Sequence, residues 1–288
     1  MGGKFALRTM AGLVLVASTS AACASRATTP PRQRPVTDRL VLRIDNRGGL
    51  LPPAVALTRI PQFSLFTDGL IVMEGAQIQI YPGPAIPPIF SMKVNAEGLR
   101  KIMEAARRAG LGGPDRTYEH PAVADAGTTT FTFVENGKRH VISAVALGTE
   151  PNPAIPKHEQ RARAALFELE MRLGNVRSWL PEGSVSAERP FDYDGLAVVV
   201  GTEPPGEQPE QPELTWPLDR TIAELAEPVA GQPILSCFSV EGQDLEKLRP
   251  LVARANELTP WSSGGKTSWL RFRPLLPDET GCPGGPEG

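Results

Sequence analysis

Short runs in the first half of the chain alternate between apolar and polar residues with the period of a β-strand. Asp68-Gly69 lies between two such runs and Asn136-Gly137 divides another, and both dipeptides favour the two-residue turns of β-hairpins. We therefore expect an antiparallel sheet. Its predicted strands are LVLRIDN (40–46), FSLFT (63–67), LIVME (70–74), IFSMKV (89–94) and the two arms of TTTFTFVENGKRHVISAVAL (128–147).

Two other segments repeat apolar residues at helical spacing. Residues 95–113 carry such a row and end in several glycines, which commonly stop a helix. Residues 157–176 carry a second row that ends at Gly174. Since each segment has a single apolar side, both helices are predicted to pack on one face of the sheet.

The second half of the chain shows similar strand and helix patterns, but they are less regular. Strands are predicted at 195–200, 233–240 and 267–275, with a helix at 242–258 in which Pro250 must sit early or cause a kink. The stretches FSMKVNAEGLRK and SCFSVEGQDLEK share a strand-turn-helix pattern, which suggests two related units, although helical patterns also repeat by chance. The predicted fold class is α+β, with units at 40–182 and 183–288.

The N-terminus has the composition of a secretory signal. Lys4 and Arg8 precede the apolar stretch MAGLVLVA and a run of small residues. Ser20-Ala21-Ala22-Cys23 resembles the lipobox of bacterial lipoproteins, in which the cysteine is lipidated, but Ser20 departs from the usual Leu, Val or Ile. Residues 1–23 are predicted to be a signal peptide, with Cys23 either lipidated at the outer face of the cytoplasmic membrane or removed by ordinary cleavage and secretion.

Residues 24–39 lack apolar periodicity and are rich in proline and arginine, which is typical of a flexible tether. If Cys23 is lipidated, these arginines would lie near anionic headgroups. Beyond Cys23 the chain has only Cys237 and Cys282. A disulfide is the natural interpretation in an oxidising compartment, because a metal or redox pair would favour closer spacing.

The bulk charge and the motifs exclude several functions. The 288 residues have a formal net charge of −2, so no broad basic field favours nucleic acid as a partner. Gly264-Gly265-Lys266-Thr267 resembles a phosphate-binding loop, which requires a strand before it and a helix after it. Here we expect the reverse order, a turn that leads from a helix to a strand. Ser263 and Lys266 also match Ser-x-x-Lys, without the companion motifs of penicillin-binding enzymes.

No catalytic, metal or cofactor site is predicted. His120, His140 and His158 lack zinc-ligand spacing and are expected to be solvated at the surface. The carboxylates nearest turns could act as an acid pair only if folding brings two of them together. These carboxylates are Glu119, Asp125, Asp192 and Asp194.

Two surfaces are candidates for binding. The proline-rich YPGPAIPPI, which begins at Tyr81, cannot pair as a central strand and is either an exposed recognition segment or a rigid connector. In TSWLRFRPL, alternation places Trp269, Arg271 and Arg273 on the face opposite Leu270 and Phe272. If Leu270 and Phe272 face the core, the row of Trp269, Arg271 and Arg273 faces outward and could form an interface. The alternative is a structural role, in which Trp269 packs against a second layer of the chain.

Several stretches carry a family resemblance. ALTRIPQFSLFTDG, YPGPAIPP, ADAGTTTFTF, LTPW and RFRPLLPDETGC resemble uncharacterised secreted or lipid-anchored proteins of high-GC Gram-positive bacteria. The resemblance implies export and a Cys237–Cys282 pair within the fold, and it implies no activity. We expect an exported lipoprotein that binds a cell-envelope protein or a small ligand; the alternative is a cofactor-independent envelope hydrolase.

Overall fold

The computed structural model of this chain describes residues 1–3, 39–49, 51–76, 79–121, 123, 125–149, 151–204 and 206–283. Cys23, residues 4–22 of the predicted signal peptide and residues 24–38 of the predicted tether lie outside the described residues. The chain divides into Met1–Gln33 and one compact unit, Arg34–Gly288, and the fold given below is that of the compact unit.

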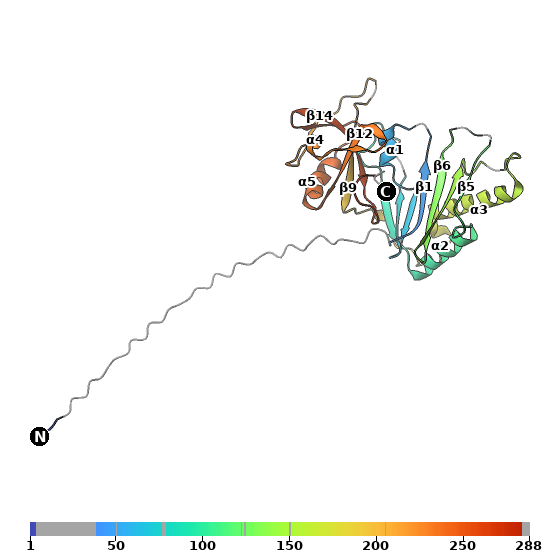
Figure 1. Cartoon of the computed structure of the whole chain (residues 1–288), viewed down its shortest axis with the longest axis horizontal. Helices are drawn as coiled ribbons and strands as arrows, with labels where there is room; N and C mark the ends of the chain where they lie inside the picture. The colour runs from blue at the N-terminus through green and yellow to red at the C-terminus, as the bar shows by residue number, and fades with distance from the viewer. Residues whose placement is uncertain are drawn as a thin grey trace. The chain divides into compact units, whose positions relative to one another are not determined.

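The first sheet has eight strands in the order β5-β7-β6-β1-β2-β3-β4-β8 (Figure 1). All neighbours are antiparallel except β5 and β7, and the predicted turns at Asp68-Gly69 and Asn136-Gly137 are confirmed. The strands are β1 (Leu40–Arg47), β2 (Phe63–Phe66), β3 (Leu70–Glu74), β4 (Ile89–Lys93), β5 (Arg116–Tyr118), β6 (Thr128–Glu135), β7 (Lys138–Val145) and β8 (Arg189–Pro190).

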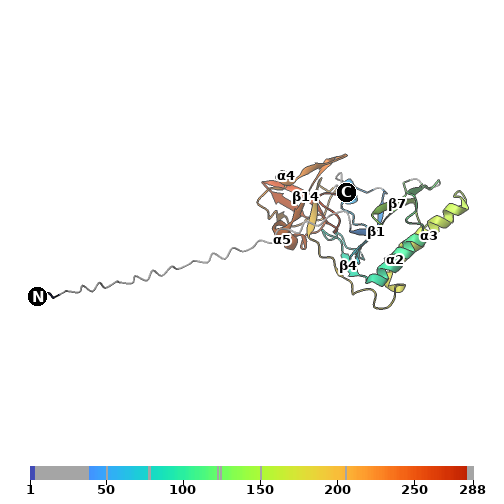
Figure 2. The same cartoon turned by 60° about the horizontal axis from the view of Figure 1, so that its bottom comes forward.

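Helices α2 (Ala96–Arg108) and α3 (Lys157–Gly174) pack on one face of this sheet, as predicted (Figure 2). The Asn95 side chain caps α2 by accepting a hydrogen bond from the Gly98 backbone. Between sheet and helices lies the largest apolar core, which includes Leu42, Ile44, Phe63, Leu65, Phe131, Phe133, Ile102, Leu166, Leu169 and Leu173. A short 3-10 helix, η1 (Val176–Ser178), follows α3.

The second sheet has six strands in the order β10-β13-β14-β9-β12-β11, and only β10 and β13 are parallel. Leu245, Leu248 and Val252 of α5 pack on one face, against a core that includes Trp216, Trp261, Phe238 and Phe272. Its elements are β9 (Gly195–Gly201), β10 (Leu214–Thr215), α4 (Ile222–Leu225), β11 (Glu227–Val229), β12 (Gln232–Glu241), α5 (Gly242–Val252), β13 (Pro260–Ser263) and β14 (Lys266–Pro274). The α+β class is thus confirmed.

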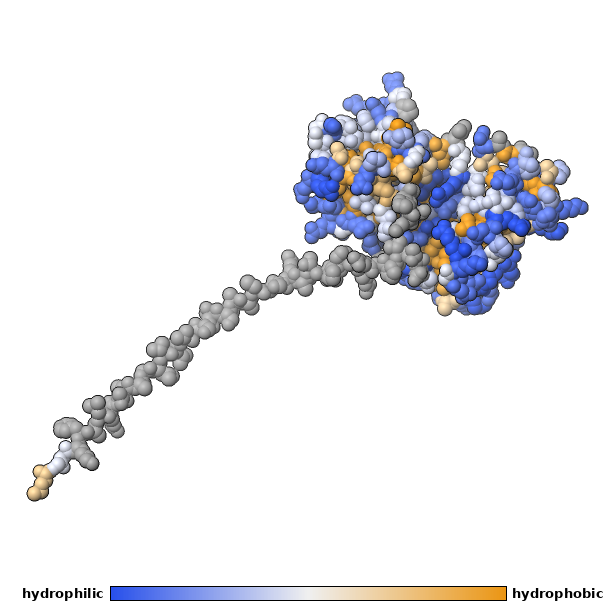
Figure 3. Space-filling view, viewed as in Figure 1, coloured by the Kyte–Doolittle hydropathy of each residue, from blue (hydrophilic) through white to orange (hydrophobic). Residues whose placement is uncertain are grey.

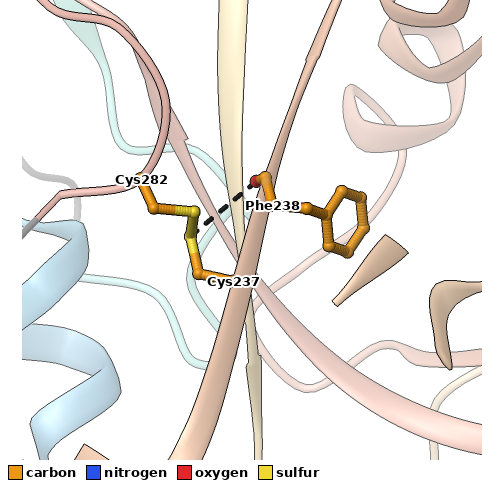
Figure 4. The surroundings of a disulfide bond; sticks show 3 residues. All are labelled: Cys237, Phe238 and Cys282. Carbon is orange, nitrogen blue, oxygen red and sulfur yellow. Dashed lines mark hydrogen bonds between the residues drawn. A yellow bond between two sulfur atoms is a disulfide. The ribbon is translucent and has the colours of Figure 1, made fainter. Parts of the chain in front are cut away.

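A further layer lies between the two sheets. It consists of α1 (Pro53–Thr58), which the sequence did not predict, and residues 275–282 near the C-terminus. Figure 4 shows Cys237 and Phe238 pointing to opposite sides of β12, with Phe238 toward a helix and Cys237 toward Cys282. The Cys237–Cys282 disulfide is confirmed, with the two Cα atoms 6.0 Å apart.

Two local predictions need correction. Gly264-Gly265 forms a turn, but it joins β13 to β14, so its flanks are two antiparallel strands instead of a helix and a strand. Both glycines have positive φ, as a tight hairpin turn of this type requires. Pro250 does not lie early in α5. It lies in the last turn, where its missing N–H removes one hydrogen bond of the helix close to its C-terminal end.

The division of the fold into units at 40–182 and 183–288 stays a prediction. The first sheet extends past residue 182, because β8 pairs with β4 through Phe90↔Pro190 and Ser91↔Arg189. The layer between the sheets contains α1 from the first half of the chain and residues 275–282 from its end. None of the helices in the described ranges is long and apolar enough to cross a membrane.

Replacing Cys237 and Cys282 together by alanine should lower the free energy of unfolding by about 4 kcal/mol, because the disulfide closes a loop of 45 residues. Urea unfolding of chains that all carry Cys23→Ala measures this loss. The reduced parent should match the double variant, and reductant should not affect the variant. Equal midpoints for the oxidised parent and the variant would contradict the stabilising role.

Candidate functional site

A cavity with converging polar groups lies where β1 ends, beside α3, and we call it the β1–α3 pocket. Its volume is about 430 Å³, within the range of small-molecule sites. Five chain segments contribute to it. Its lining residues are Asn46, Arg47, Gly48, Arg59, Gln62, Gly127, Thr129, Ala146, Leu147, Phe167, Glu170 and Met171.

The position of the pocket follows from the way the apolar rows of two strands end. Leu42 and Ile44 of β1 belong to the core on the helical face, and Asn46 is the next residue with the same alternation. Thr129 of β6 pairs directly with Asn46 and precedes Phe131 in the corresponding row. Polar side chains therefore replace apolar ones at this end of the sheet, and they form the floor of the pocket.

These polar side chains form one hydrogen-bond network. The Thr129 hydroxyl donates to the Asn46 side-chain oxygen at 2.8 Å, and the Asn46 amide donates to Gln62 Oε1 at 2.6 Å. The amides of Asn46 and Gln62 both hydrogen-bond to the Glu170 carboxyl group. The network joins β1, β6, the α1–β2 connection and α3, so the floor is preorganised by its own contacts.

Glu170 is the only carboxylic acid among the lining residues. Burial raises the pKa of Glu170 above its ordinary value, against the hydrogen bonds from Asn46 and Gln62, which favour the charged form. A carboxyl group with this balance can donate a hydrogen bond when protonated and accept one when ionised. It is the group in the pocket best suited to bind or to exchange a proton.

Apolar side chains of α3 form the rim of the pocket. Phe167 and Met171 are one helical turn apart and expose 39% and 61% of their surface, respectively. A Cβ atom on Gly148 would lie 2.7 Å from the Phe167 ring, and Gly148 also has a positive φ of 87°. Only glycine at this position allows the ring to rest on the turn after β7. The aromatic rim is therefore held in place by the backbone.

Two exposed guanidinium groups complete the lining. Arg47 is the last residue of β1, and Arg59 follows the C-terminus of α1. Within the described part of the chain, neither side chain forms an ion pair. The pocket thus combines a polar floor, an apolar rim and two cations.

The predicted Trp/Arg surface is only partly exposed. Leu270 and Phe272 face the core as expected, but Arg273 is 5% exposed, so the prediction of an outward-facing Trp/Arg row is wrong for this residue. The reason is that α1 and residues 275–282 cover that face of the second sheet. Trp269 and Arg271 are half-buried, and Arg271 pairs with Glu257 at 3.4 Å. Their role in binding stays a prediction.

Arg273 instead belongs to a buried group of charges between the sheets, which we call the inter-sheet ion cluster: Arg43, Arg273, Asp278 and Glu279. Arg273 donates to both oxygens of Glu279, at 2.6 and 2.7 Å, and Arg43 pairs with Asp278 at 2.7 Å. Burial alone would raise the pKa of Glu279, but the guanidinium of Arg273 holds it below its ordinary value. The cluster is structural because its charges satisfy one another.

Tyr81 and the prolines after it form a connector that contacts the second half of the chain. Pro84 forms an isolated bridge with Asn256, and the Ala85 backbone N–H donates to the Ala255 carbonyl at 3.2 Å. Tyr81 is 66% exposed, and its hydroxyl hydrogen-bonds to Gln208, in the segment between β9 and β10. As predicted, the segment does not form a central strand. Its use as a recognition surface stays a prediction.

The prediction of solvated surface histidines is wrong for two of the three. His120 and His140 are each 7% exposed, whereas His158 is exposed. His140 pairs with Phe133 across the β6–β7 hairpin, so it faces the helices, and its Nδ1 lies 2.6 Å from the Gly113 carbonyl oxygen. In the described ranges, no group of three or more His, Cys, Asp or Glu side chains could hold a metal ion.

Sequence reasoning missed every residue of the β1–α3 pocket. A usable signal existed in β1 and β6, where Asn46 and Thr129 interrupt the apolar rows at the same end of two neighbouring strands. The exposed Phe167 and Met171 on an otherwise polar helical side were a second signal. Searches for similar proteins add nothing to this assignment: no family model, no curated protein and no solved structure matches the chain.

Glu170→Gln should remove a pH dependence of stability. Because the pKa of Glu170 is raised in the folded state, its protonation stabilises the fold below the ordinary value of 4.5, and this contribution is lost as pH rises through the folded pKa. In urea unfolding, the parent should therefore lose stability relative to the variant as the pH rises above the ordinary value of 4.5. Glu168→Gln, an exposed change on the same helix, is the control; identical pH profiles for the parent and Glu170→Gln would refute the assignment.

Proposed function

We propose that this protein is an exported cell-envelope binding module that takes a small ligand into the β1–α3 pocket. The observation that carries the proposal is the combination of a preorganised polar floor with an exposed apolar rim in one cavity. Such sites bind small molecules through apolar contact and gain specificity from a few oriented polar groups. On the face shown in Figure 3, hydrophobic residues form separate patches among hydrophilic ones, which favours a pocket over a broad docking surface.

Export is supported by the signal-like N-terminus and by the disulfide. Cys237 and Cys282 are bonded, and disulfides persist mainly in oxidising compartments. The lipobox-like Ser20-Ala21-Ala22-Cys23 and the resemblance to exported proteins of high-GC Gram-positive bacteria point the same way. We propose that Cys23 carries a lipid anchor at the outer face of the cytoplasmic membrane.

The alternative function is a cofactor-independent hydrolase, and Glu170 is the observation that favours it, because a raised pKa suits a general acid. The other lining residues supply no obvious partner for that role. Among them are amides, arginines, a threonine and apolar residues, but no second carboxylate, histidine, serine or cysteine. Glu170 also accepts structural hydrogen bonds from the floor. Binding therefore has the stronger support.

Met171→Asp should weaken binding of the neutral fluorescent probe N-phenylnaphthylamine by about tenfold or more, because a charge replaces apolar contact area at the rim. Fluorescence titration of the folded, oxidised chain measures the change. Ile234→Asp is the matched control, since Ile234 is 63% exposed on β12, compared with 61% for Met171. Absence of saturable binding, or equal losses in the two variants, would count against the pocket.

Cys23→Ala should release the protein from the membrane when it is expressed in a Gram-positive host. The parent should fractionate with membranes and carry the mass of a diacylglycerol group, because lipidation requires the cysteine thiol. Cell fractionation and intact-mass measurement provide the test. If parent and variant are both released and both begin at Ser25, the lipid anchor is wrong, whereas export and the pocket proposal remain.

A further inference from the structure

We propose that the ligand of the β1–α3 pocket is a small amphipathic anion: Arg47 and Arg59 bind its acidic head, and Phe167 and Met171 contact its apolar body. This inference rests on the proposed function and specifies the chemical class of the ligand. Three features support this ligand class: the lining is mainly positively charged, the carboxylates of the inter-sheet ion cluster are paired with other residues, and the rim of the pocket is apolar.

Positive charge dominates the lining. Arg47 and Arg59 are two of its three ionisable residues, and Glu170 is the third. Paired guanidinium groups are well suited to bind carboxylate, sulfonate or phosphate oxygens, because each presents a planar set of N–H donors. A cationic ligand would have to approach both arginines, so the lining disfavours one.

The carboxylates of the inter-sheet ion cluster are committed to other partners. Asp278 and Glu279 pair with Arg43 and Arg273 in the inter-sheet ion cluster. Asp45 interacts electrostatically with Arg43 and Arg47, but burial raises its pKa, so its negative charge is disfavoured. Among the described residues, neither Arg47 nor Arg59 has a carboxylate within ion-pair distance, and their donors can receive an external anion.

Burial raises the pKa of Glu170, which disfavours its negative charge relative to that of an exposed glutamate. Its oxygens accept hydrogen bonds from Asn46 and Gln62, and burial favours its protonated form. In that form its proton can be donated to an oxygen of the ligand. The protonated carboxyl group would then add a hydrogen-bond donor to the same lining as the two guanidinium groups.

The rim requires an apolar portion in the same ligand. Phe167 and Met171 expose apolar surface beside the cations, and Ala146 and Leu147 extend that surface across the turn after β7. A cavity of about 430 Å³ accommodates a molecule of small-drug size. An inorganic anion alone would leave the rim uncovered, which is why the assignment is to an organic anion with an aromatic or short aliphatic body.

Two matched probes test the charge preference on the folded, disulfide-bonded chain. Anilinonaphthalene sulfonate is anionic, and N-phenylnaphthylamine presents a similar apolar body without the charge. The sulfonate should bind at one site per chain and about tenfold more tightly than the amine. Arg47→Gln/Arg59→Gln should abolish this preference by weakening sulfonate binding much more than amine binding. The control, Arg139→Gln/Arg161→Gln, removes the same charge from exposed positions outside the pocket.

The outcomes separate this inference from the proposed function. If the amine binds at the pocket but the sulfonate binds no more tightly, or if the Arg47/Arg59 variant retains the preference, the anion assignment is overturned and the pocket stands. If the control pair abolishes the preference equally, the effect is one of net charge and the assignment also fails. If neither probe binds, both the assignment and the proposed pocket function are overturned.

Discussion

The bidentate pair between Arg273 and Glu279 is the interaction on which the arrangement of the two sheets depends. A buried ion pair is stable only when further hydrogen bonds satisfy its remaining donors and acceptors. Here the Arg273 Nε donates to the Arg59 carbonyl at 3.0 Å, and Glu279 also accepts the Leu276 backbone N–H at 2.9 Å. The pair thus fixes the chain near the C-terminus against β14 and, through Arg59, against the segment that enters β2.

The same contact links the interior of the molecule to its candidate site. Arg59 contributes its carbonyl to the inter-sheet ion cluster and its side chain to the lining of the β1–α3 pocket. β1 is shared in a similar way: Arg43 faces the cluster, and Asn46 faces the pocket. Opposite faces of one strand therefore carry the structural charges and the polar floor, so the pocket is built on a rigid part of the fold.

Local patterns sufficed for the longer helices and strands, for the two hairpin turns of the first sheet and for the disulfide, because these depend on residues close in sequence or on a cysteine count. They missed α1, α4 and the short strands β5, β8, β10, β11 and β13. The register of β7 is harder to assign from the sequence, because the row that faces the helices contains His140 as well as Ile142. The burial of Arg273 and the pocket could not be derived locally. They depend on which segments cover a sheet face, and Arg43 and Asp278 are 235 residues apart.

The layer between the sheets has a consequence for how the protein matures. A chain that is synthesised from its N-terminus presents β1 long before residues 275–282, which fill the space behind that strand, have been made. Contacts of such long sequence separation form late, because closing the intervening loop is entropically costly. One face of the first sheet therefore stays incomplete until the C-terminal residues arrive, and apolar residues of that face are exposed until then.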